Sequence, residues 1–92
     1  MLIILKGILK KKMPKKEVSQ TLSIMDFVMV IDEDSQYPQK VLVTATNDNI
    51  QLVQAVPDGR LVEAKVYLRG KEKDNGMVFN QFNLSQIKPV VE

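Results

Sequence analysis

Two segments of alternating apolar residues flank a short acidic turn between residues 27 and 47. The apolar positions are Phe27, Met29 and Ile31 in the first segment, then Val41, Val43 and Ala45 in the second. Because successive side chains of a strand point to opposite faces, each segment has one apolar face. The sequence therefore predicts a hairpin with strands at 21–32 and 37–46, joined by a polar turn at 32–35.

Alternation also marks strands before and after this hairpin. An N-terminal strand is expected over residues 1–12, and Gly7 within it predicts a bulge or bend. The clearest half-buried strand is Leu61–Arg69, where apolar and polar residues alternate strictly. A polar loop at 70–76, with Asn75-Gly76 able to supply positive φ, then predicts a hairpin to a last strand at 77–88.

One short helix is expected between the third and fourth of these strands. Asn47-Asp48 is typical of an N-cap, residues 49–56 suit an amphipathic helix, and Pro57-Asp58-Gly59 would end it. Three strands, a helix and a two-stranded hairpin make up the order of the OB-fold, an all-β, five-stranded Greek-key barrel. An SH3-like barrel is the main alternative, but it would carry only a 3₁₀ turn at this point. The 92 residues are expected to form a single domain, 1–92.

The residue types absent from the chain restrict its chemistry. It contains no histidine and no cysteine, so it can form neither a Ser-His or Cys-His nucleophile pair nor a thiolate zinc site. The acidic run at 32–34 lacks the spacing of a calcium loop and is expected to be a solvated turn. We therefore expect no catalytic site, metal or cofactor.

The N-terminal region is basic and apolar but does not fit a secretory signal. Residues 1–16 hold six lysines and no acid, which leaves seven basic and eleven acidic residues in the remainder. In a signal peptide the positive charge precedes the apolar run, whereas here the lysines follow it. The run is also too short to span a bilayer. We expect a cytoplasmic protein with no membrane partner.

The hairpin sequence resembles a known family. The pattern F-V-x-x-x-D at 27–32 followed by Q-Y-P-x-K-V at 36–41 is similar to small bacterial and phage OB-fold proteins of unknown function, which are distantly similar to single-stranded DNA-binding proteins. The resemblance extends over most of the chain. It implies an OB-fold that is not an enzyme and that binds single-stranded DNA or RNA nonspecifically.

Basic residues are expected to gather at the two loops that flank the binding face of an OB-fold. Such a groove could follow a sugar-phosphate backbone, with tyrosines as stacking platforms. The candidate residues are Lys10, Lys11, Lys12, Lys15, Lys16, Tyr37, Lys40, Tyr67, Arg69, Lys71 and Lys73. The alternative is that the lysines are only solvated, that Tyr37 covers the end of the barrel and that Tyr67 pairs across strands.

A second function stays open, namely a subunit that assembles with protein and binds no nucleic acid. Residues 1–5 are apolar on both faces, and Val28 and Val30 are expected to point away from the barrel interior, so we predict a homo-oligomer. Phe79 and Phe82 are three residues apart and should lie on opposite faces of one strand. The related family has a tryptophan where this chain has Thr46-Asn47, which favours the assembly alternative.

Overall fold

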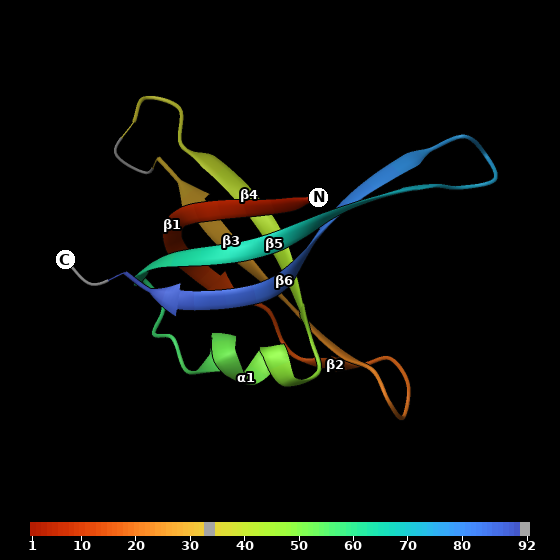
Figure 1. The fold of residues 1–92 in the computed structure, drawn as a ribbon, viewed down its shortest axis with the longest axis horizontal. Coiled ribbons are helices and arrows are strands. Elements are labelled where there is room, and N and C mark those ends of the chain that lie inside the picture. The colour runs from red at the N-terminus through yellow and green to blue at the C-terminus, as the bar shows by residue number, and fades with distance from the viewer. Residues whose placement is uncertain (33–34, 91–92) are drawn as a thin grey trace.

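The structure is a computed structural model that describes residues 1–32 and 35–90. Its elements are, in chain order, β1 (Leu2–Lys12), β2 (Lys16–Glu17), β3 (Ser23–Ile31), β4 (Gln39–Thr46), α1 (Asp48–Gln54), β5 (Leu61–Glu72) and β6 (Val78–Pro89). The strands pair in the order β1-β5-β6-β4-β3-β2, and β1 also pairs with β3. The five long strands thus close into a barrel, with α1 between the third and fourth of them (Figure 1). This topology confirms the OB-fold.

β1 serves both halves of the barrel because it bends. Residues 2–8 pair with β5, residues 8–12 pair with β3, and the register with β3 shifts between Leu9 and Lys11. At Gly7 the backbone of β3 comes so close that an added Cβ would overlap the carbonyl oxygen of Val30 and lie 2.8 Å from Ile31 Cδ1. Glycine is needed here for close approach as well as for the bend.

The inward faces of the strands and one face of α1 form a single core. Phe27, Met29 and Val43 are fully buried, as the alternation predicted. The cluster consists of Leu9, Met25, Phe27, Met29, Val43, Ala45, Ile50, Val53, Val56, Val62, Ala64, Val66, Leu84 and Ile87. Phe82 packs against it while Phe79 is 43% exposed, so the two phenylalanines differ in burial as expected.

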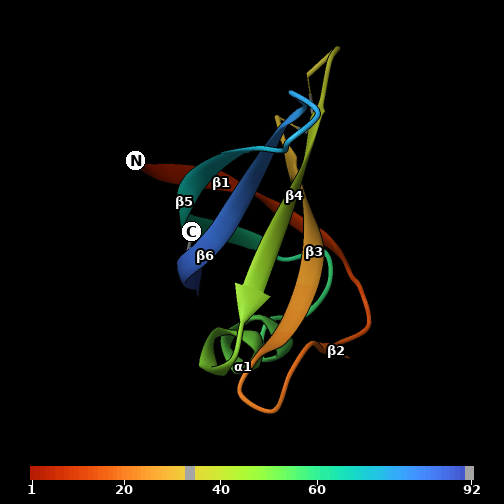
Figure 2. The same ribbon diagram turned by 90° about the vertical axis from the view of Figure 1, so that its right-hand side faces the viewer.

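α1 closes one end of the barrel, below β3 and β4 in Figure 2. Its buried residues are Ile50 and Val53, and Asn47 stands at the N-cap position. The side chain of Asn47 does not cap the helix, because its Oδ1 accepts a hydrogen bond from the backbone N–H of Ser23 at 2.9 Å. This hydrogen bond therefore connects the N-terminus of α1 to the start of β3.

The hairpin of β5 and β6 is longer than the sequence indicated. Gly70 lies in β5 opposite Asn80, and the pairing continues to Glu72 opposite Val78. The predicted loop at 70–76 is therefore wrong at its start, although Gly76 has the expected positive φ, 84°. The paired tip projects from the barrel as a two-stranded ribbon, residues 69–81 (Figure 1). Charged residues fit these strands because residues 69–81 are exposed.

The apolar surface is not distributed over the strands as predicted. Val30 is buried and Val28 is half-buried, so β3 exposes less apolar surface than predicted. Val30 is flanked on both sides, since β3 pairs there with both Ile8 of β1 and Lys40 of β4. The exposed apolar side chains lie elsewhere, notably on β1.

Candidate nucleic-acid interface

The outer face of β3 and β4 is the surface on which an OB-fold is expected to bind nucleic acid. Its cross-strand pairs are Ile24 with Thr46, Asp26 with Thr44, Val28 with Leu42, and Val30 with Lys40. Near its centre the hydroxyl of Thr44 donates a hydrogen bond to Asp26 Oδ1 at 2.6 Å. A carboxylate and aliphatic side chains occupy this face, and no aromatic ring lies among these pairs to stack on a base.

The end of β1 and the segment that follows it carry the first group of candidate cations. Lys10, Lys11, Lys15 and Lys16 are all exposed. Lys16 belongs to β2, which pairs with the start of β3 opposite Ile24. This short strand was not predicted, and it fixes part of what the sequence indicated as a basic loop. The first basic segment is thus partly ordered on the barrel.

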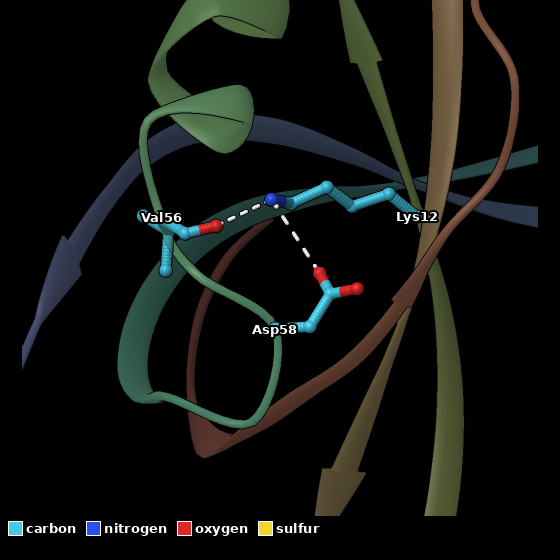
Figure 3. Close-up of polar contacts among 3 residues, drawn as sticks. All are labelled: Lys12, Val56 and Asp58. Carbon is cyan, nitrogen blue, oxygen red and sulfur yellow. Dashed lines mark hydrogen bonds and ion pairs between the residues drawn. The ribbon is translucent and has the colours of Figure 1, made fainter.

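Lys12 differs from its neighbours because its ammonium group has partners within the barrel. Lys12 Nζ donates to the backbone carbonyl of Val56 and lies 3.4 Å from Asp58 Oδ1 (Figure 3). Its side chain is only 22% exposed. The carbonyls that follow a helix lack intrahelical partners, and a lysine can satisfy one of them. Lys12 therefore joins the end of β1 to the connection between α1 and β5.

The second group of cations lies on the β5–β6 ribbon, together with an exposed aromatic ring. On one face of the ribbon, Arg69 pairs with Gln81 and Lys71 with Phe79. Lys73 Nζ lies 4.4 Å from the centroid of the Phe79 ring, within the range of a cation–π interaction. A surface cavity of 560 Å³ is lined by Leu68, Arg69, Gly70, Lys71, Phe79 and Gln81.

Phe79 is not among the candidate site residues predicted from the sequence, which indicated that Phe79 or Phe82 is exposed and favoured oligomer packing over base stacking for that ring. Lys73 N–H donates to Met77 O across the turn, which sets the register that places Lys71 opposite Phe79. The loop has three residues, 74–76, with Gly76 at positive φ, whereas a two-residue Asn75-Gly76 turn would have paired Asp74 with Met77, one residue out of this register. Tyr67 follows on the same face opposite Asn83 and is 46% exposed.

The two basic segments project on the same side of the barrel. In Figure 1 the β5–β6 ribbon and the segment around β2 both extend to the right. Figure 2 is the view from that side, and it shows β3 and β4 running between the ribbon above and the β2 segment below. The backbone of the β5–β6 ribbon and that of the β2 segment therefore lie at opposite ends of β3 and β4 on this side.

Tyr37 and Lys40 lie apart from Lys15 and Lys16, at the opposite end of β3 and β4. Lys10 and Lys11 are nearer to this end, because β1 pairs with β3 between Ile8 opposite Val30 and Lys11 opposite Val28. Tyr37 precedes β4 and is 73% exposed, so it does not cover the end of the barrel. Lys40 is exposed near the start of β4. Of the acidic turn, Glu33 and Asp34 lie outside the described residues.

Residues 1–32 and 35–90 contain neither a metal-binding cluster nor a membrane-spanning helix. No group of three acidic residues in this part of the chain is placed to hold a metal ion. No helix there is long and apolar enough to cross a membrane.

Comparison with protein families identifies a match over most of the chain. The family described as "Domain of unknown function (DUF3127)" matches residues 4–87. The chain belongs to this family. No curated protein matches this DUF3127 chain.

Solved structures similar to this DUF3127 protein are OB-fold proteins with little sequence identity to it. The mitochondrial single-stranded DNA-binding protein Rim1 of S. cerevisiae has a TM-score of 0.71 and 16% identity, covering 98% of this chain and 94% of that one. The N-terminal domain of PriB from Thermoanaerobacter tencongensis, solved as a dimer, has a TM-score of 0.72 and 13% identity, covering 99% and 97%. PriB from Ralstonia solanacearum has a TM-score of 0.73 and 11% identity, covering 97% of both chains. At these identities the likeness concerns the fold.

Proposed function

We propose that this protein is a binding module without enzymatic activity that holds single-stranded nucleic acid without base specificity. The observation that supports this most is the position of two basic segments along the same side of an OB barrel. They consist of Lys10, Lys11, Lys15 and Lys16 in the first, and Arg69, Lys71 and Lys73 in the second. Phosphate contacts from such residues provide affinity that does not depend on sequence. The similarity in fold to Rim1, a single-stranded DNA-binding protein, supports the same role.

The ribbon supplies the stacking surface that the β3–β4 face lacks. Phe79 and Tyr67 share one face of β5 and β6, with Arg69 and Lys71 beside them. A base could stack on an exposed aromatic ring while the neighbouring cations contact its phosphates. Tyr37 and Lys40 would contact a longer strand at the far end of the β3–β4 face. Lys12 is not part of the proposed interface, because its ammonium group contacts Val56 and Asp58.

The proposal is tested by removing charge from one segment at a time. The first triple variant carries Lys11→Gln, Lys15→Gln and Lys16→Gln, and the second carries Arg69→Gln, Lys71→Gln and Lys73→Gln. The matched control carries Arg60→Gln, Lys65→Gln and Lys88→Gln, which removes the same charge outside both segments. In each segment variant the slope of log K against log salt should become shallower by about 1.4, if the two segments share about four phosphate contacts at roughly 0.7 per contact. An equal decrease of the salt slope in all three variants would contradict a defined interface.

Assembly through protein contacts is the second candidate function, with a homo-oligomer as its simplest form. The observation that favours it is the exposure of large apolar side chains on β1, where Leu2 is 50% and Ile4 is 59% exposed. Exposed apolar surface of this kind often marks a protein interface. The two functions are compatible, since Leu2 and Ile4 lie in the N-terminal half of β1, whereas Lys10 and Lys11 lie at its C-terminal end.

A further inference from the structure

Asp26 places a carboxylate on the β3–β4 face, which lies between the ribbon and the β2 segment (Figure 2). Its side chain is half-buried and follows Ile24 on the outer side of β3. The ion pairs formed within residues 1–32 and 35–90 do not include Asp26, so no cation neutralises it there. Because a phosphate and a carboxylate repel each other, Asp26 must face another part of a bound strand.

The hydroxyl of Thr44 holds the Asp26 carboxylate in one position. Thr44 is only 6% exposed, and its hydroxyl donates to Asp26 Oδ1 at 2.6 Å. An ionised carboxylate accepts hydrogen bonds and donates none, and its two oxygens offer about four acceptor positions. The bond from Thr44 occupies one of these positions. The carboxylate therefore keeps acceptor capacity for a hydrogen-bond donor of a ligand.

Lys16 lies on the same face and relates Asp26 to the path of the phosphates. β2 pairs Lys16 with Ile24, which is two residues before Asp26 on β3. Such diagonal neighbours point to one face of a sheet and lie about 7 to 8 Å apart. A nucleotide is large enough to span this distance, with its phosphate at Lys16 and the edge of its base at Asp26.

We propose that Asp26 accepts a hydrogen bond from the exocyclic amine of a base, so that the protein prefers cytosine to thymine where a strand crosses the β3–β4 face. Cytosine presents its N4 amine as a donor, whereas thymine presents its O4 carbonyl as an acceptor at the same position. A carboxylate attracts the amine and repels the carbonyl oxygen. Adenine also carries such an amine, but cytosine is the base that matches thymine in ring size.

The inference rests on the proposed function and refines it. Phosphate contacts from the basic segments would hold a strand of any sequence, and Asp26 would add a preference at one position of that strand. A hydrogen bond to a charged group is stronger than one between neutral groups. We expect oligo-dC to bind about tenfold more tightly than oligo-dT of the same length.

Anisotropy titrations with the two labelled oligonucleotides test this preference in the native protein and in two variants. Asp26→Asn keeps the shape of the side chain but removes its charge, so the ratio of the two affinities should fall from about tenfold to about one, mainly because oligo-dT binds more tightly. Asp48→Asn is the matched control, since Asp48 is exposed on α1, outside the β3–β4 face. It should keep the native ratio. Equal affinities in the native protein, or a ratio that survives Asp26→Asn, would overturn the inference.

A modified base gives the same test without changing the protein. In 2-pyrimidinone a hydrogen replaces the N4 amine of cytosine, while the ring nitrogen and the O2 carbonyl stay. The native protein should bind an oligonucleotide of this base no more tightly than oligo-dT, and binding as tight as that of oligo-dC would contradict the contact with the amine. If neither oligo-dC nor oligo-dT binds at low salt, the proposed function fails together with the inference. If both bind with the expected dependence on salt and with equal affinity, only the role of Asp26 fails.

Discussion

Gly7 shows how a single residue can determine whether the barrel closes. Ala at this position should destabilise the protein by roughly 3 kcal/mol, because the new Cβ would overlap the carbonyl oxygen of Val30 and force β1 away from β3. Chemical denaturation measures the difference in the free energy of unfolding between the variant and the native protein. Gly70→Ala is the matched control, since its Cβ would meet only Asn80 Oδ1 at an ordinary 3.6 Å. If Gly7→Ala and Gly70→Ala lose equal stability, the close approach of β3 at Gly7 is not the cause of the destabilisation.

Lys12 and Lys11 are neighbours in sequence with different roles. Lys12→Met should lower the free energy of unfolding by about 1 to 2 kcal/mol, because the carbonyl of Val56 loses its donor. Lys11→Met should change stability by less than about 0.5 kcal/mol and weaken nucleic-acid binding instead. Thermal melts and anisotropy titrations of both variants separate the two effects. A stable Lys12→Met protein would contradict the structural role of Lys12.

Residue roles could be predicted from the sequence only where they depend on local pattern. The burial of Phe27 and Met29 follows from alternation along one strand. The contact of Lys12 with Val56 joins residues 44 positions apart, and that of Asn47 with Ser23 joins residues 24 apart. A lysine in a basic run and an asparagine before a helix have ordinary local explanations, so these long-range partners were not foreseen.

At the scale of elements, the ribbon should contribute to binding more than to stability. Phe79→Ala should reduce affinity for single-stranded DNA between about fivefold and a hundredfold, through the loss of one stacked base. Its stability should change little, because Phe79 lies outside the core cluster. Phe82→Ala, on the same strand, should instead cost about 2 to 4 kcal/mol of stability, since Phe82 packs against the core. Unchanged affinity in the Phe79→Ala protein would remove the ribbon from the proposed interface.

The order of the elements was predictable, but the ends of some of them were not. Alternation and the Asn47-Asp48 signal gave five strands and a helix in the observed order. The ribbon extends further because strand pairing continues among residues exposed on both faces, which carry no apolar pattern to reveal it. β2 consists of two residues that pair with β3, and a strand this short has no alternating pattern by which it could be predicted.

At the scale of the whole molecule, the protein combines a barrel closed by β1 with basic segments on one side. Net charge is only +2, so binding through phosphate contacts must come from the uneven placement of the cations. The fold and the clustering of basic residues could be inferred from the sequence, but not that Lys10 and Lys11 lie in β1, or that Arg69 and Lys71 lie in β5. The proposed stacking ring, Phe79, could not be singled out, because its exposure depends on how far the ribbon projects from the barrel.

The most direct test of nucleic-acid binding is the fluorescence anisotropy of labelled oligo-dT titrated with the native protein at several salt concentrations. If about four cations contact phosphates, log K should fall with log salt with a slope near −3, at roughly −0.7 per contact for single strands. Saturable binding with this slope is the predicted result. The absence of binding at low salt, with the protein at tens of micromolar, would contradict the proposed function.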